Sequence, residues 1–196
     1  MAFFGRLMRC PFFSAASAVS LALTLAAAAS VSGCGSPGRW GHSPQYVPAS
    51  GEQDAIADTR DLNDGAQALL TFEKWKGAKV RFFMVVDERK PGPGGAAYVT
   101  GQLHTLNEIN GCANKHDNDS CRVTIKPTGH DTVHAIVRLS GEDDIGELRV
   151  GTGTLLRVVG VLSDQTDPDD GKLVIQGSWY RQWPIGYYAK EGDLLQ

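Results

Sequence analysis

The chain has 196 residues, 42% of them hydrophobic, and its 19 Lys and Arg against 22 Asp and Glu give a formal net charge of −3 at pH 7. This length is enough for one domain of ordinary size with a hydrophobic core. A mildly acidic chain without a cluster of lysines or arginines lacks the electrostatic footprint of a nucleic-acid binder, so its charge argues against nucleic acid as a partner.

The first 33 residues have the composition of an export signal. Arg6 and Arg9 precede an apolar stretch at 15–29, and no acidic residue occurs before Glu52. A membrane-spanning helix needs roughly 20 consecutive, strongly apolar residues, whereas serine and alanine dilute this stretch. We therefore predict a signal peptide at 1–33 that is removed on export. Its loss removes two arginines, so the net charge of −3 becomes −5.

The segment Val31-Ser32-Gly33-Cys34 resembles the lipobox of bacterial lipoproteins. In that family the cysteine thiol receives a diacylglyceryl group, the preceding peptide is cleaved, and the new amino terminus is acylated. The resemblance implies a membrane anchor at Cys34, because each buried CH₂ contributes about 0.8 kcal/mol. Gly35 and Ser36 stand where an aspartate retains enterobacterial lipoproteins in the inner membrane, so the implied location is the outer membrane, facing the periplasm. An ordinary cleaved signal with a chance cysteine is the alternative.

After the cysteine, residues 34–58 are rich in Gly, Pro and Ser, with three prolines between 37 and 48. This composition predicts a flexible tether. A single domain at 59–190 and a tail at 191–196 are expected to follow.

A helix is expected at the start of the domain. Asn63 and Asp64 are suitable caps, Lys74 and Lys76 fall in the last turn, and Gly77 stands just beyond. The apolar side chains between these ends predict that the helix packs onto a sheet.

The hydrophobic period changes after the helix, and each later apolar run is bounded by Gly, Pro or Asp turns. The expected strands are 80–86, 97–103, 121–126, 133–139, 155–162 and 172–180. In the fourth run every odd position is apolar, as a half-buried strand requires. One helix followed by six strands predicts a mainly β domain.

A small antiparallel β-barrel is the preferred form of this domain. Gly101, Gly160 and Gly177 lie inside strand-like runs, where glycine marks a bulge or a barrel corner. The runs 155–162 and 172–180 around an Asp-rich turn loosely resemble the late strands of OB-fold domains. The preceding helix and the short strands are similar to those of periplasmic OB-like lipoprotein domains. An open β-sandwich is the alternative fold.

Cys112 and Cys121 are expected to form a disulfide in an oxidising compartment. Closing so short a loop adds about 2 to 3 kcal/mol by the chain-entropy argument. A metal site with His116, Asp117 and Asp119 of the same loop is the alternative, but the spacing matches no zinc pattern.

The other groups of polar residues are better explained by structural roles than by metal binding or catalysis. The acidic run before Gly171 has the wrong order for an EF-hand and predicts a solvated hairpin turn; its members are Asp164, Asp167, Asp169 and Asp170. The scattered histidines are interpreted as surface residues; they are His104, His116, His130 and His134. No nucleophile elbow, metalloprotease motif or phosphate loop is present, so no catalytic residue, metal or cofactor is predicted.

The carboxy-terminal segment 177–188 concentrates aromatic side chains beside an arginine, which is the composition of binding hot spots. The candidate binding surface is Trp179, Tyr180, Arg181, Trp183, Tyr187 and Tyr188. The alternative is that Trp179 closes one end of the barrel and the tyrosines pack on its wall, since amphipathic rings often cover a core.

Together these features favour a non-catalytic β-barrel binding module for an envelope protein or glycan, held at the membrane by lipid on Cys34. One alternative is an OB-fold binder of single-stranded nucleic acid or oligosaccharide, which only the fold likeness supports. The other is an envelope enzyme with an unrecognised site.

Overall fold

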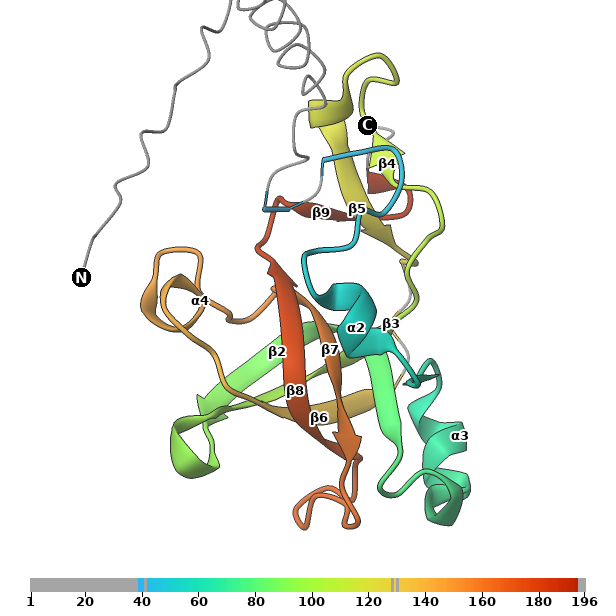
Figure 1. Ribbon diagram of the computed structural model, residues 1–196, viewed down its shortest axis with the longest axis vertical. Helices are drawn as coiled ribbons and strands as arrows, with labels where there is room; N and C mark the ends of the chain where they lie inside the picture. Colours follow the sequence, from blue (N-terminus) through green and yellow to red (C-terminus); the bar gives the residue numbers. More distant parts are fainter. Residues whose placement is uncertain (1–38, 41, 128, 130, 194–196) are drawn as a thin grey trace, which may run out of the picture. The chain divides into compact units, whose positions relative to one another are not determined.

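The computed structural model describes residues 39–40, 42–127, 129 and 131–193 (Figure 1). The expected signal peptide and the expected lipidation site, Cys34, lie outside the described residues. Within the described part, no helix is both long enough and apolar enough to cross a bilayer.

The described part consists mainly of strands, with short helical turns between them. The helices are α2 (Glu52–Ile56), α3 (Gly65–Leu70), α4 (Glu142–Ile145) and the 3-10 turns η2 (Phe72–Lys74), η3 (Pro93–Gly95) and η4 (Asn118–Ser120). The strands are β1 (Arg60–Asp61), β2 (Lys79–Pro91), β3 (Ala97–His104), β4 (Gly111–Cys112), β5 (Cys121–Ile125), β6 (Thr132–Val137), β7 (Leu155–Leu162), β8 (Val174–Trp183) and β9 (Tyr188–Lys190).

Five strands close into a barrel in the order β2-β3-β6-β8-β7, and β7 pairs back onto β2. Every pair is antiparallel except β6 with β8, which run parallel. If the five barrel strands are numbered by their order in the chain, they lie around the barrel in the order one, two, three, five, four. This is the strand order of an OB-type barrel. The mainly β fold, the OB-like barrel and the preceding helix α3 are therefore confirmed, and the β-sandwich is excluded by the closing β2–β7 pair.

Glycine stands where the barrel strands bend. Gly101 lies opposite the register shift in β2, and a Cβ on it would be 2.2 Å from the carbonyl oxygen of Val85. Gly160 pairs with Gly177 at the register shift between β7 and β8, and a Cβ on Gly160 would be 2.3 Å from a backbone oxygen of β8. The predicted role of these glycines at barrel corners is confirmed.

The barrel interior is the main hydrophobic core. Alternate side chains of β2 point inward, and Val80, Phe82, Met84 and Val86 are all buried there. Full burial of side chains of this kind contributes about 1.5 to 3 kcal/mol each. Because successive side chains of a strand point to opposite faces, the side chains between these four point to the outer face of the barrel.

A second core covers one outer face of the barrel. Phe83 of β2, Leu155 of β7 and Trp183 of β8 pack there against Val123 and Ile125 of β5. In Figure 1, β5 lies with β4 and β9 in a small sheet apart from the barrel strands. One of the six expected strands, 121–126, thus belongs to this small sheet, while the other five form the barrel.

The segment before β1 also packs on this outer face, which corrects the expectation of a free tether through residue 58. Trp40 and Tyr46 contact the second core, Gln45 forms a bridge with Ile109, and α2 places Glu52 in a fully buried position. Prolines exclude long helices and strands here, but they do not prevent aromatic side chains from docking.

Helix α3 is shorter than expected. Asp64 caps it as predicted, because its Oδ1 accepts a 2.7 Å hydrogen bond from the Gln67 amide. The helix stops at Leu70, the Thr71 hydroxyl donates to the Gln67 carbonyl at 2.9 Å, and a 3-10 turn follows. The helix therefore ends, with Thr71 as its C-cap, before the lysines and glycine that marked its expected end.

Candidate functional site

Two of the six residues of the expected carboxy-terminal binding surface are buried, and the other four are half-buried. Trp183 is 0% exposed and donates from Nε1 to the Trp40 carbonyl at 3.0 Å. Arg181 is also buried and donates to the Val47 carbonyl at 2.7 Å. The prediction that this cluster forms an open surface is therefore wrong for these two residues, because the segment from 39 to 58 covers them.

The tyrosines of the cluster pack as the alternative anticipated. The Tyr180 ring lies against the barrel core and its hydroxyl donates to Asp143 at 3.0 Å. Tyr187 packs on Trp40 with ring centroids 4.1 Å apart, and the Tyr188 hydroxyl donates to the Gly153 carbonyl at 2.8 Å. Trp179 is half-buried, as the three tyrosines are, and lies on β8 beside Val159 of β7. A cluster with so many structural partners is not a free docking face.

Beneath this segment lies a buried ionic network. The Glu52 carboxylate forms ion pairs with Arg157 and Arg181, and it accepts hydrogen bonds from the Tyr46 hydroxyl and the Ala49 amide. Both guanidinium groups also lie over aromatic rings, including that of Tyr46. The single negative charge of Glu52 thus balances one of the two buried positive charges. Its ion pairs also hold α2 against the barrel.

This environment changes the acidity of Tyr46. Burial is the main cause that raises its pKa to about 12, and the nearby Arg157 opposes that shift. The phenol therefore stays protonated at neutral pH and remains a donor to Glu52. Sequence reasoning missed the network because Glu52 lies in the segment 34–58, whose composition predicts a flexible tether.

The expected disulfide between Cys112 and Cys121 is present and confirmed. These residues face each other across β4 and β5, at the base of a polar loop. Within the loop, the Ser120 hydroxyl donates to the carbonyls of Asn114 and Asp117, and Asp117 caps η4. The carboxylates and the histidine of this loop are exposed, as expected for a closed surface loop.

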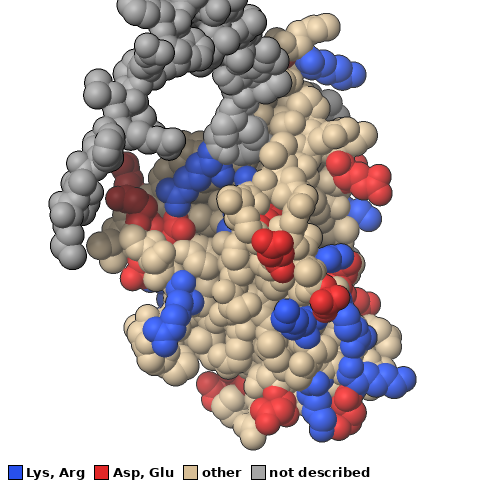
Figure 2. All heavy atoms as spheres, in the orientation of Figure 1, with Lys and Arg blue, Asp and Glu red and all other residues tan. Residues whose placement is uncertain are grey.

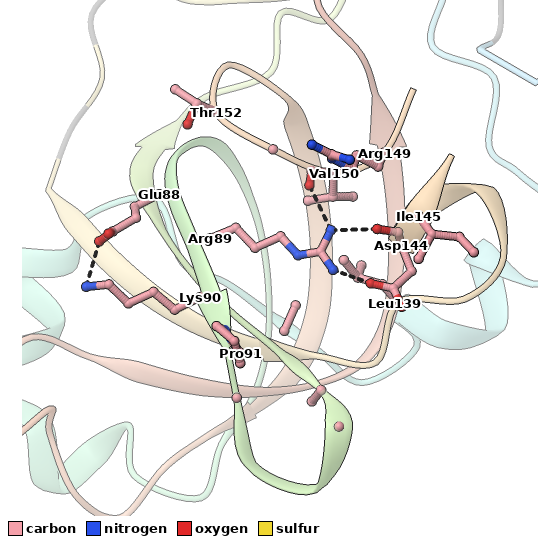
Figure 3. A pocket seen from close by; sticks show the side chains of 15 residues that line it. Glu88, Arg89, Lys90, Pro91, Leu139, Asp144, Ile145, Arg149, Val150 and Thr152 are labelled. Atoms are coloured by element: carbon pink, nitrogen blue, oxygen red, sulfur yellow. Dashed lines mark hydrogen bonds and ion pairs between the residues drawn. The ribbon is translucent and has the colours of Figure 1, made fainter. Parts of the chain in front are cut away.

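A cavity of about 720 Å³ opens at one end of the barrel (Figure 3). Its walls are the β2–β3 hairpin and the loop that runs from β6 through α4 to β7. The residues that line it include Glu88, Arg89, Lys90, Pro91, Asp144, Ile145 and Arg149. Nothing in the sequence singled out this place, because the two walls are about 50 residues apart and carry no shared motif.

The charges that line the cavity do not cancel. Arg89 bridges the two walls, because it pairs with Asp144 and donates to the Val150 carbonyl at 3.1 Å (Figure 3). Lys90 pairs with Glu88 on the hairpin at 2.8 Å. Among the described residues, the guanidinium of Arg149 has no hydrogen-bond or ion-pair partner, and Figure 3 draws it on the loop wall near Val150. The cavity therefore offers one unpaired cation to an anionic group.

A second polar group lies on the barrel wall beside the loop from β7 to β8. His134 of β6 is buried, and its Nε2 lies 3.0 Å from Asp170 of that loop. Its Nδ1 contacts the Thr100 hydroxyl at 2.9 Å, and its ring lies against that of Tyr98. Asp167 accepts a hydrogen bond from Tyr98. The interpretation of His134 as a surface histidine is therefore wrong, because the loop folds over it.

The predicted hairpin turn is present in the same loop. Asp167 Oδ1 accepts hydrogen bonds from the amides of Asp169 and Asp170, at 2.9 and 3.3 Å. These bonds and the donor Tyr98 lower the pKa of Asp167, with the Tyr98 bond as the largest cause. The carboxylate thus remains ionised beside His134.

No family model matches the chain, and no curated protein matches it. Among solved structures, two of PriB from Ralstonia solanacearum match with 18% and 16% identity and a TM-score of 0.26 for both. They cover 54% and 53% of this chain and 97% and 94% of their own. A deletion mutant of the single-stranded DNA-binding protein from Thermus aquaticus matches with 17% identity and a TM-score of 0.29, over 55% of this chain and 51% of that one.

The exclusion of nucleic acid as a partner is corrected here, because the barrel is of the OB type, a fold that accommodates oligonucleotides as well as oligosaccharides. The exclusion relied on the net charge of the whole chain, which averages over local differences. Figure 2 shows Lys and Arg side chains lying among Asp and Glu side chains on the face that it draws. The surface expected to bind an envelope protein or glycan is the aromatic cluster, in which Arg181 and Trp183 are buried, so the cluster as a whole does not offer that partner an open surface.

Proposed function

We propose that this chain is a non-catalytic binding module that holds single-stranded nucleic acid at the cavity between the β2–β3 hairpin and the loop from β6 to β7. The observation that supports it most is the unpaired guanidinium of Arg149 on the wall of that cavity. OB folds bind oligonucleotides and oligosaccharides with their second and third strands and the adjoining loops. The corresponding elements here are β3, β6, the β2–β3 hairpin and the β7–β8 loop, and the hairpin is the one that lines the cavity.

The cavity has the chemistry that a strand of nucleic acid requires. A guanidinium donates two parallel hydrogen bonds to a phosphate, and such charge-assisted bonds are about twice as strong as neutral ones. Lys90 can turn from Glu88 toward a second phosphate, because an exposed ion pair contributes little. Ile145, which is 80% exposed beside the cavity, and Pro91 offer apolar contacts to a base.

A fluorescence anisotropy titration with a labelled oligo(dT) of about 12 nucleotides at low salt tests this proposal. We expect saturable binding whose affinity falls as salt is raised, because phosphate contacts release counterions. Arg149→Ser should weaken binding by about tenfold or more, the effect of losing a hydrogen bond to a charged group. Lys115→Ser is the matched control, since it removes one exposed positive charge from the disulfide loop.

Three results would contradict the proposal. The first is the absence of binding at low salt, and the second is an equal loss of affinity in both variants. The third is tighter binding of an acidic oligosaccharide than of oligo(dT), which would assign the cavity to a different polymer. Double-stranded DNA of the same length serves as a competitor and distinguishes single-stranded binding from general attraction to phosphate.

We also propose, from the sequence alone, that the module is exported and lipid-modified at Cys34 in the outer membrane. The lipobox-like segment Val31-Ser32-Gly33-Cys34 supports this. Intact-mass measurement of protein purified from membranes should show loss of residues 1–33 and the added mass of acyl chains, and Cys34→Ser should abolish both. Unmodified protein that keeps its first 33 residues would overturn this part of the proposal.

A further inference from the structure

His134, Asp167 and Asp170 bring three potential metal ligands together on the barrel wall. Their ligand atoms, one from each residue, lie within 4.8 Å of one another. The histidine comes from β6, and the two carboxylates come from the loop between β7 and β8, drawn in orange in Figure 1. Residues far apart in the chain thus converge on one point of the surface.

From this arrangement we propose that His134, Asp167 and Asp170 bind a divalent transition-metal ion, with Zn²⁺ as the representative. An imidazole and two carboxylates are suitable ligands for zinc, with bonds of about 2.0 to 2.2 Å. A tetrahedral ion at such distances separates its ligand atoms by roughly 3.4 Å. The three groups therefore need only small side-chain movements to close around an ion.

The histidine is held as a ligand would be. The His134 side chain is 7% exposed, its ring lies against Tyr98, and its Nε2 faces the two carboxylates. Thr100 contacts the other ring nitrogen at 2.9 Å. Metal-binding histidines are oriented by such a partner on the second nitrogen. The ring needs no new rotamer to present Nε2 to an ion.

The carboxylates retain capacity for the ion. Asp167 accepts from Tyr98 and from two backbone amides, and Asp170 Oδ1 accepts from the Lys172 amide at 2.9 Å. A carboxylate has about four acceptor positions, so each keeps at least one for the metal. Two carboxylates also balance the charge of a divalent ion.

The site has one open side. Asp170 is partly exposed, with 41% of its side-chain surface accessible, so an ion can reach it without unfolding of the barrel. Three protein ligands leave a fourth position for water or an external group. When it is filled, the ion ties the β7–β8 loop to β6. The inference is independent of the proposed nucleic-acid site, which lies on other residues.

Isothermal titration of the purified, tag-free protein with Zn²⁺ tests this site. We expect one ion per chain and a raised melting temperature, because a ligand that binds only the folded state stabilises it. His134→Gln and Asp170→Asn should each weaken binding by tenfold or more. Two controls remove similar groups elsewhere: His116→Gln, an exposed histidine of the disulfide loop, and Asp164→Asn, an exposed acid of the same β7–β8 loop.

Cobalt gives a second readout, because Co²⁺ bound in a tetrahedral site has intense visible absorption. The wild type and both controls should show these bands, and the two site variants should lack them. Asp170→Asn changes a partly exposed loop residue, so its fold should survive even if His134→Gln unfolds. Absence of binding in the wild type, or a loss of binding with His116→Gln equal to that with Asp170→Asn, would overturn the proposal.

Discussion

Replacing Glu52 by glutamine tests the buried network that fastens α2 to the barrel. The substitution keeps the shape of the side chain but removes the charge between Arg157 and Arg181, whose side chains are 11% and 9% exposed. Two buried cations then face each other without a carboxylate. Removing one partner of a buried ion pair costs about 3 to 5 kcal/mol, so we expect a loss of stability of that size.

The corresponding fall in melting temperature is roughly 6 to 20 °C for a domain of this length. Urea unfolding followed by tryptophan fluorescence measures the free energy directly. Asp54→Asn, an exposed acid two residues along in α2, is the control and should stay close to wild type. Adding Arg157→Met to Glu52→Gln should restore part of the stability, because it removes one of the stranded cations. A loss below about 1 kcal/mol for Glu52→Gln would refute the network as an anchor.

Three further changes follow from the same structure. Trp183→Ala should lower the free energy of unfolding in urea by about 3 to 5 kcal/mol, because it empties a fully buried position. An unchanged stability would contradict the burial of this side chain. Replacing Cys112 and Cys121 together by serine should cost about 2 to 3 kcal/mol, the chain-entropy value for so short a loop, and a neutral result would contradict it. Since the pKa of Tyr46 is raised from 10.0 to about 12, its stabilisation is complete below pH 10 and is lost as pH rises toward 12; spectroscopic titration should show one tyrosine ionising late, and Tyr46→Phe should remove it.

The barrel strands could be predicted because the sequence patterns that specify them lie within each strand. Alternation of apolar side chains and glycine at the bends are visible in the sequence, and β7 begins and ends where the pattern placed it, at Leu155 and Leu162. The strands β4 and β9 have only two and three residues. They form because β5 supplies partners for both, and no local pattern indicates such a pairing.

The sites were harder to predict than the fold, because composition does not separate a core from a surface. Trp183 and Arg181 have the residue types of a binding hot spot, yet they lie under the segment from 39 to 58. That segment looked like part of a linker because residues 34–58 as a whole are rich in Gly, Pro and Ser. Arg149 carried no motif, and only the fold shows that it lines the cavity with the hairpin.

We have proposed that the barrel holds single-stranded nucleic acid at the cavity beside Arg149, and this claim can be mapped residue by residue by nuclear magnetic resonance. Oligo(dT) is added to ¹⁵N-labelled protein, and amide shifts are followed residue by residue. The claim predicts the largest shifts in the hairpin 91–96 and the loop 139–152, with loss of these shifts in Arg149→Ser. Shifts centred on the disulfide loop 112–121, or none at saturating oligonucleotide, would contradict it.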